Sequence, residues 1–323
     1  MNMPKNGLKR EPRLACALTL VLALLLPLCL AHAAPAMQEK PQLAAPEKVA
    51  RGDAFVAEVV SATPMDGAAF FWRGKRHAVA AREVQDAAGG APLWRAELML
   101  PAPLGEKAQS LSLGACAGKE CGKPEATRKV GLYDRKRPVQ RLTVDRKYVA
   151  PPPEEAARIR SDREKVAAAL AQRLPERQWE LPLDRPVPGT VSSLFGLKRV
   201  FNGEPRGMHR GLDLRGGEGS PIRACADGVV ALVDNLYFSG NAVYINHGDG
   251  VFTSYLHMSK PLVKPGEHVK RGQVIGLVGA TGRVTGPHLH LGLVVQGESV
   301  DPQPLLAPAE QVKPASAAGG EKK

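Results

Sequence analysis

Residues 185–306 combine a high density of glycine with short apolar runs, and this pattern limits the folds open to them. A hairpin signal, His247-Gly248-Asp249-Gly250, separates two of the runs. Short apolar runs bounded by Gly and Pro are typical of β-strands. The predicted strands are Val229–Val233, Ala242–Asn246, Val251–Leu256, Val274–Val278 and His288–Val294. The sequence therefore predicts a mainly antiparallel β domain over residues 185–306.

The preceding residues also predict β structure. Between residues 48 and 150, short apolar runs alternate with Gly, Pro and Asp, which favours a small β-sandwich with Trp72 and Trp94 in its core. The clearest runs are Ala54–Val60, Ala68–Trp72, Leu93–Leu100 and Leu111–Gly114. Residues 151–184 form a linker that begins with three prolines and continues as one connecting helix, Glu154–Leu174, ended by Pro175. The fold class is thus mainly β.

The two ends of the chain differ from this pattern. Four basic residues precede the apolar run 14–30, and Ala31-His32-Ala33 offers small residues before a cut. This order predicts a cleaved signal peptide over residues 1–33, although an uncleaved membrane anchor and a lipoprotein built on Cys29 are alternatives. Residues 34–47 are expected to be a flexible lead, and residues 307–323 a disordered tail.

Charge and cysteine content narrow the partners and the compartment. The formal net charge of +12 suits an anionic partner. No basic stripe interleaved with aromatics and no Cys/His finger spacing accompanies it, so nucleic acid is not expected. Cys116 and Cys121 lie in a Gly-rich stretch and are predicted to form a local disulfide in an oxidising compartment, with a metal pair as the alternative. Cys225, between two alanines, is expected to be a small buried residue.

Two histidines two residues apart carry the clearest chemical signal. In Gly286-Pro287-His288-Leu289-His290-Leu291-Gly292, alternation along a strand places His288 and His290 on one face and the leucines on the other. The leucine face is expected to be buried. Adjacent imidazoles disfavour joint protonation, and a metal is a common reason for such a pair.

Other motifs supply further candidate ligands. His209 and Asp213 lie four residues apart among glycines, in a loop or short strand. His257 ends a predicted strand and is expected to share a face with Tyr255, whereas His247 and His268 are expected to be surface histidines. Together the motifs offer two histidines and one aspartate as ligands, with two histidines to spare. Catalytic zinc sites use three protein ligands and leave a fourth position for water.

In combination, these residues resemble those of the M23 metallopeptidases, the lysostaphin and LytM-like cell-wall endopeptidases. The resemblance extends from Ser192-Ser193-Leu194-Phe195-Gly196 through the His209…Asp213 pair and Gly272-Gln273-Val274-Ile275-Gly276 to Thr285-Gly286-Pro287-His288-Leu289-His290. It implies a LytM-like peptidase fold in which His209, Asp213 and His290 bind one zinc ion per chain, and His257 and His288 are catalytic. In latent members an upstream residue blocks the zinc, and Asn202 is the candidate here. Several secreted relatives also have an N-terminal β domain.

The resemblance implies a secreted zinc endopeptidase that cuts peptide cross-links of peptidoglycan, with D-alanine–meso-diaminopimelate bonds as the expected target. The expected location is the periplasm or cell envelope, with membrane contact only through an uncleaved or lipidated signal. Regulatory protein partners are further candidates. The alternatives are an inactive or autoinhibited regulator of other wall hydrolases, a periplasmic metal-binding protein, and a peptidase acting on a protein such as elastin.

Overall fold

The computed structural model describes residues 40–85 and 89–308. The predicted signal peptide, residues 34–39 of the predicted flexible lead and the predicted tail beyond residue 308 lie outside these ranges. Within them, no helix is both long enough and apolar enough to cross a membrane.

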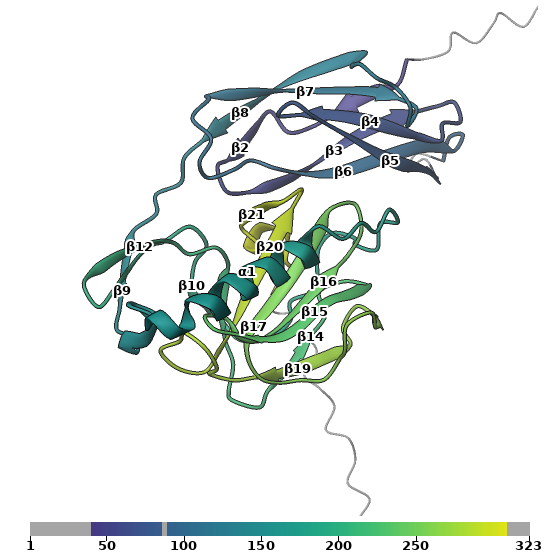
Figure 1. Ribbon diagram of the computed structural model, residues 1–323. Helices are drawn as coiled ribbons and strands as arrows, with labels where there is room; N and C mark the ends of the chain where they lie inside the picture. Colours follow the sequence, from purple (N-terminus) through teal and green to yellow (C-terminus); the bar gives the residue numbers. More distant parts are fainter. Residues whose placement is uncertain (1–39, 86–88, 309–323) are drawn as a thin grey trace, which may run out of the picture. The chain divides into compact units, whose positions relative to one another are not determined.

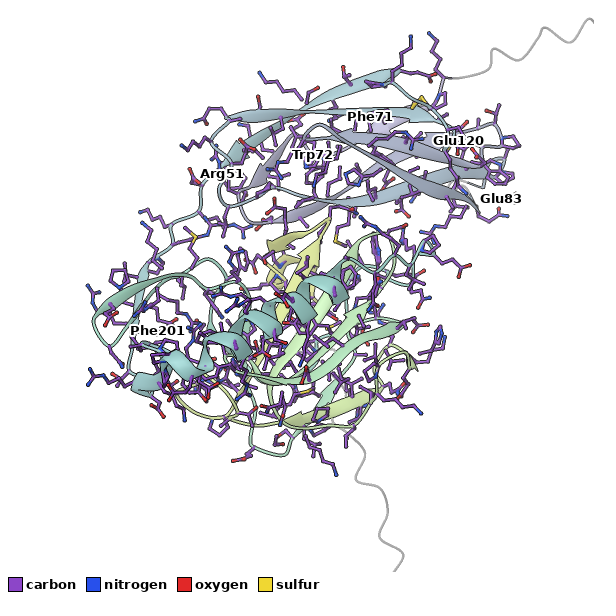
Figure 2. All side chains as sticks on the ribbon, in the orientation of Figure 1. Arg51, Phe71, Trp72, Glu83, Glu120 and Phe201 are labelled. Atoms are coloured by element: carbon purple, nitrogen blue, oxygen red, sulfur yellow. A yellow bond between two sulfur atoms is a disulfide. The ribbon has the colours of Figure 1, made fainter. Side chains whose placement is uncertain are left out.

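The N-terminal β region is an eight-stranded arrangement in the order β1-β3-β6-β5-β4-β7-β8-β2 (Figure 1). Its strands are β1 Gln42–Ala44, β2 Lys48–Ala50, β3 Ala54–Ser61, β4 Gly67–Trp72, β5 Lys75–Val84, β6 Leu93–Pro101, β7 Ser110–Ala117 and β8 Ala126–Tyr133. Each of the four predicted runs falls in one of these strands. Trp72 is buried in the core, where its indole N–H donates to the Pro101 carbonyl at 2.9 Å (Figure 2). Trp94 is only half-buried.

Four strands of this region lie outside the predicted runs. Strands β1 and β2 have three residues each, and β1 lies in the segment expected to be a flexible lead, where it pairs antiparallel with β3. Strands β5 and β8 were missed because of their composition. Strand β5 reads Lys-Arg-His-Ala-Val-Ala-Ala-Arg-Glu-Val, and only Val79 and, partly, a few neighbours are shielded from solvent. Strand β8 reads Ala-Thr-Arg-Lys-Val-Gly-Leu-Tyr, and two basic residues and a threonine interrupt its apolar residues. A strand with one charged face has no continuous apolar run to reveal it, and its pairing with neighbouring strands is what fixes it.

The C-terminal β region contains a ten-stranded sheet whose main path is β10-β13-β20-β17-β16-β15-β18. Its strands are β10 Val191–Ser193, β13 Leu212–Arg215, β14 Pro221–Arg223, β15 Gly228–Leu236, β16 Gly240–Asn246, β17 Val251–Pro261, β18 His268–Val269, β19 Val274–Val278, β20 His288–Val295 and β21 Glu298–Val300. The strands on the main path pair antiparallel, as predicted, and the 247–250 hairpin joins β16 to β17. A leucine-rich core packs beneath β20 and β13.

A small second sheet lies beside this one. It consists of β9 (Val139–Leu142), β11 (Lys198–Phe201) and β12 (Glu204–Met208), with β9 parallel to β11. Residues between the two β regions thus pair with a strand that comes just before the His209…Asp213 motif. This pairing brings Gln140, Leu142 and Val144 to the pocket described below.

The connecting helix α1 spans Ala156–Leu170, shorter at both ends than predicted. A 3-10 turn, Pro153–Glu155, precedes it. Ala169 is buried against Ala231 and Tyr244, and Lys165 pairs with Asp234 of β15 at 2.7 Å. The helix therefore covers β15 and β16, and the protein as a whole is mainly β, as predicted.

Candidate functional site

Three neighbouring strands of the ten-stranded sheet carry four of the five candidate residues, and His209 lies in the loop between β12 and β13. Strand β20 lies between β13 and β17, and its register places His290 opposite both Asp213 and Leu256. Leu289 and Leu291 face the other way and are fully buried. The predicted division of β20 into a histidine face and a leucine face is therefore what the structure shows.

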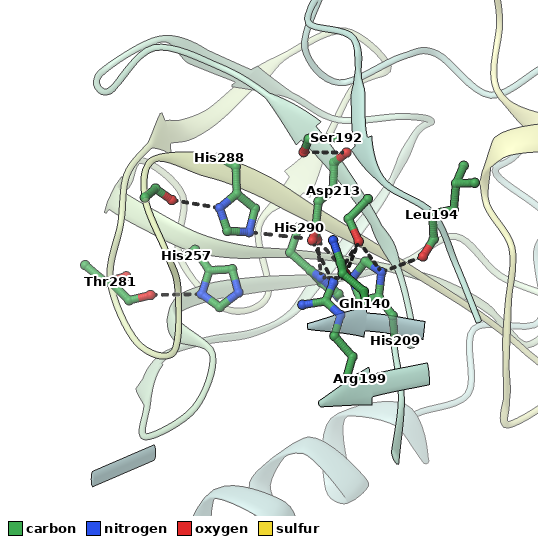
Figure 3. Close-up of polar contacts among 12 residues, drawn as sticks. Gln140, Ser192, Leu194, Arg199, His209, Asp213, His257, Thr281, His288 and His290 are labelled. Carbon is green, nitrogen blue, oxygen red and sulfur yellow. Dashed lines mark hydrogen bonds and ion pairs between the residues drawn. The ribbon is translucent and has the colours of Figure 1, made fainter. Parts of the chain in front are cut away.

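His209, Asp213 and His290 form a tight cluster (Figure 3). One carboxylate oxygen of Asp213 lies 3.0 Å from Nε2 of His209 and 2.8 Å from Nδ1 of His290, and these two nitrogens are 3.0 Å apart. The Nδ1–H of His209 donates to the Leu194 carbonyl at 2.7 Å, which leaves its Nε2 with a lone pair aimed at the cluster.

The three side chains are close enough to bind one metal ion together. One ligand atom from each of the three residues lies within 4.8 Å of the others. Two imidazole nitrogens that approach a shared carboxylate oxygen, all with lone pairs pointing inward, are a donor set that suits zinc. Gly211 lies between the two motif residues, and a Cβ at this position would come 2.4 Å from Nε2 of His290. Only glycine leaves room for the His290 ring.

The charge state of Asp213 is set by its neighbours. Burial by itself raises the pKa of this carboxyl, but its close contacts with the imidazoles of His209 and His290 outweigh burial and hold the pKa well below its usual range. Arg199 adds a contact from Nη2 to the second carboxylate oxygen at 2.9 Å. Asp213 is therefore an anion held from both sides, ready to ligate a cation.

His257 reaches the site through an unusual backbone conformation. Strand β17 pairs with β20 as far as Leu256 and with β19 from Met258 onward. At the change of partner, His257 has a φ of 66°. A left-handed conformation is costly for any residue other than glycine and interrupts the strand's alternation. The His257 ring centroid consequently lies 5.1 Å from that of His288.

The expectation that His257 shares a face with Tyr255 is wrong. Tyr255 lies in the apolar core, where its hydroxyl accepts a hydrogen bond from the Cys225 backbone N–H at 2.8 Å. The left-handed residue turns His257 the other way, and strict alternation cannot foresee such a bulge.

His257 and His288 are held in the same manner. Nδ1–H of His257 donates to the Thr281 carbonyl, and Nδ1–H of His288 donates to the Gly286 carbonyl, each at 2.8 Å. Each ring therefore keeps its Nε2 free to act. Burial, and after it the proximity of His290 and His288, lowers the pKa of His257 to about 3, so this imidazole is neutral at neutral pH.

Two residues that line the site, Gln140 and Arg199, have no signal in the sequence motifs. Ser193, from the first motif of the resemblance, lies 3.3 Å from Nδ1 of His209 and donates to the Gln140 side chain at 2.9 Å. Arg199 donates to both Ser193 and Asp213. Gln140 and Arg199 come from the small second sheet, and only the pairing of β9 with β11 shows that they belong to the site.

Asn202, the candidate inhibitory ligand, does not join the cluster. Its side-chain amide accepts from the Val144 N–H at 3.0 Å and donates to the Val144 carbonyl at 2.9 Å. Its φ of 52° marks the turn between β11 and β12. These two bonds fasten the 142–144 segment to the turn, and the inhibitory role of Asn202 stays a prediction.

The remaining singled-out residues lie away from the cluster. His247 is fully buried, which corrects the expectation of a surface histidine, whereas His268 is exposed as expected. Cys225 is buried and free. Cys116 and Cys121 are joined in a disulfide between β7 and the loop after it.

The cluster opens into a pocket of about 680 Å³ that contains His257 and His288. Residues from the small second sheet, from β10 and from the loop before β20 form its walls.

Comparison with known proteins gives the class of this region. Residues 207–302 match the model of peptidase family M23. The chain is 46% identical over 123 residues to peptidoglycan DD-endopeptidase ShyC of Vibrio cholerae, a match that covers 38% of this chain and 28% of that protein. It is 47% identical over 112 residues to ShyA, a peptidoglycan DD-endopeptidase of the same organism, covering 34% of this chain and 26% of that protein. The chain thus spans only about a quarter of the length of these relatives.

A solved structure extends the likeness beyond the matched domain. A Pseudomonas aeruginosa protein provisionally assigned to peptidase M23 superposes with a TM-score of 0.56 at 29% identity, covering 78% of this chain and 92% of that one. The antiparallel sheet with its His/Asp/His cluster defines the class as a metallopeptidase fold. Residues 207–302 are a peptidase family M23 domain, which confirms the resemblance inferred from the motifs.

Proposed function

We propose that this protein is a secreted zinc endopeptidase that hydrolyses peptide cross-links of bacterial peptidoglycan. One observation carries the proposal. Two imidazoles with free Nε2 atoms, His257 and His288, lie beside a His/Asp/His cluster in an open pocket. A binding or storage site has no need of the two extra histidines. The names of ShyC and ShyA supply the substrate class.

We assign roles to five residues. His209, Asp213 and His290 hold one zinc ion per chain. His257 and His288 are the catalytic histidines. We also propose that residues 185–306 act as the peptidase domain, with residues 48–150 as a separate β-sandwich domain and 151–184 as the linker.

The geometry suggests how these residues act on an amide. When bound, zinc supplies a Lewis acid and lowers the pKa of water at its open position. His257 and His288 lie in the same pocket, each with the lone pair of Nε2 left over from its carbonyl bond. One neutral imidazole would accept a proton from the attacking water at Nε2 and pass it to the leaving amine. The other would accept a hydrogen bond from that water and orient it. The Thr281 and Gly286 carbonyls hold both rings in place.

The proposed bond is the one between D-alanine and meso-diaminopimelate, and the proposed location is the periplasm or cell envelope. The basic-then-apolar N-terminus supports export, and the Cys116–Cys121 disulfide suits an oxidising compartment.

The test is digestion of purified Gram-negative peptidoglycan by the mature protein, read by mass spectrometry. We expect cross-linked dimers to become monomers, chelation to stop the reaction and zinc to restore it. The masses of the products identify the bond. A protein that carries stoichiometric zinc yet cleaves neither peptidoglycan nor isolated muropeptide dimers would instead be a regulator of other wall hydrolases.

A further inference from the structure

The pocket beside the cluster carries an excess of positive charge. Among the described residues, its lining contains one carboxylate, that of Asp213, which His209, His290 and Arg199 already engage. The cationic side chains of the lining are all arginines: Arg199, Arg206, Arg210, Arg215 and Arg283. A pocket of this kind attracts an anionic group.

Arg283 differs from the other arginines in how it is held. Its guanidinium carbon lies 4.7 Å from the ring centroid of Phe201 and 4.9 Å from that of Phe238. Two aromatic rings fix the position of the group while its N–H edge stays available, since Arg283 is only half-buried. Phe201 comes from β11, and Phe238 from the turn between β15 and β16.

Within residues 40–85 and 89–308, the charged neighbours of Arg283 are arginines and not carboxylates. Burial lowers the pKa of its guanidinium, and the neighbouring positive charges of Arg199 and Arg206 lower it further. Arg199 is committed to Asp213, and Arg206 pairs with the exposed Glu204. An anion placed against Arg283 would relieve this repulsion.

The loop that carries Arg283 also holds a catalytic histidine. The Thr281 carbonyl accepts from His257, and the Thr281 hydroxyl donates to the Met258 carbonyl at 2.8 Å. The backbone N–H of Arg283 donates to the Phe238 carbonyl at 2.9 Å. The loop is thus fastened on both sides of residue 282, and this loop bears both Arg283 and the carbonyl that holds His257.

We propose that Arg283 binds a carboxylate carried by the substrate next to the scissile amide, so that the site selects peptides in which this carboxylate is free. The inference rests on the proposed peptidase function and adds the chemistry of its substrate. A planar guanidinium matches a carboxylate with two parallel hydrogen bonds. In a cross-link made through diaminopimelate, the carbon next to the scissile nitrogen bears such a carboxylate, and amidation removes its charge.

The experiment compares three cross-linked muropeptide dimers: one with free carboxylates, one amidated at the diaminopimelate carboxylate next to the scissile bond, and one amidated at the more distant glutamate carboxylate. For the wild type, we expect kcat/KM to fall about 10- to 100-fold for the adjacent amide only, the range expected for a charged hydrogen-bonded pair. Arg283→Gln should lose a similar factor on the free dimer and no longer discriminate between the dimers. Arg283→Lys, which keeps the charge without the fork, should fall between.

Arg163→Gln is the matched control, because Arg163 is exposed on α1 and lies outside the pocket lining. Zinc content is measured for every variant. If the wild type cleaves all three dimers equally well, or if Arg283→Gln slows all three equally, the carboxylate assignment is wrong while the peptidase function stands. The assignment is also wrong if amidation of the distant glutamate carboxylate slows cleavage and amidation of the adjacent carboxylate does not. If the zinc-loaded wild type cleaves none of the dimers, the proposed function itself fails.

Discussion

At the scale of the single residue, three histidines of the site are held by the same kind of hydrogen bond. His209, His257 and His288 each donate Nδ1–H to a backbone carbonyl, so each presents Nε2 to the pocket. A main-chain acceptor fixes both the tautomer and the ring plane. Because these three histidines share one tautomer, their proposed roles differ only through position. His209 contacts Asp213 and is a proposed metal ligand, whereas His257 and His288 lie next to the cluster and are the proposed catalytic residues.

These roles predict two different kinds of loss. His257→Ala and His288→Ala should each lower turnover of muropeptide dimers at least about 100-fold, the scale of general acid–base catalysis, while bound zinc stays stoichiometric. Asp213→Ala should instead lose the metal. Activity and metal content of the same preparations are measured together. Near-wild-type activity in either histidine variant would remove that residue from the mechanism.

Arg199 acts on the site through Asp213. Its Nη2 holds the carboxylate oxygen that faces away from His209 and His290. Arg199→Met should therefore leave the ligands present but less well oriented, and weaken zinc affinity about 10- to 100-fold, as is typical for partners of metal ligands. Competition with a chelator of known affinity measures the change. An unaltered zinc affinity would show that the cluster orients itself.

His247 predicts a pH dependence of stability remote from the site. Burial lowers its pKa to about 4, with Nδ1 2.6 Å from the Asp227 carbonyl and Nε2 2.7 Å from the Thr253 hydroxyl. Because the folded pKa lies below the unfolded value, this stability is complete above about pH 6.5 and is lost as the pH falls through 4, by about 3 kcal/mol. Urea unfolding from pH 7.5 to 4 should show this loss in the wild type and not in His247→Asn. Equal slopes in the two proteins would contradict the buried neutral state.

At the scale of elements, the turn between β11 and β12 controls one wall of the pocket. Asn202 ties this turn to Val144 with two hydrogen bonds. Asn202→Ala loses both bonds and strains the positive φ, so we expect unfolding to become easier by about 2 kcal/mol, with zinc content unchanged and activity not increased. Thermal denaturation and dimer cleavage provide the readouts. A rise in activity would support the inhibitory role for Asn202.

The sequence predicts an element where its signal is local. The alternation of His288, Leu289 and His290 predicted both faces of β20, and the apolar runs predicted five of the ten strands in the sheet. The sequence-based prediction failed where the pairing of strands determines which way a side chain faces or which residues reach the site. The change of strand partner at His257 reverses a face, and the parallel pairing of β9 with β11 delivers Gln140 and Arg199 from outside every motif. His247 failed for a related reason, because a turn signal does not show which other segments cover the turn.

At the scale of the whole molecule, charge is the property that bears on the substrate. The formal net charge is +12, and the pocket lining contributes five arginines. Binding to intact peptidoglycan sacculi should therefore weaken several-fold between about 50 and 300 mM salt, as exposed charges are screened over a shorter distance. Co-sedimentation of the inactive His288→Ala variant measures binding without cleavage. Salt-independent binding would show that charge has no part in it.

The central position of β20 has a consequence for how fast metal exchanges. One of the three proposed ligands, His290, lies on a strand bounded by β13 and β17 on its two edges, with Leu289 and Leu291 in the core. Interior strands open only with large cooperative units of a protein, not by local fraying. Local opening of β20 would therefore not release a bound ion. We expect the metal to exchange through the mouth of the pocket. Exchange would then follow the accessibility of that mouth, and a peptide lying in the pocket would trap the ion for as long as it stays bound.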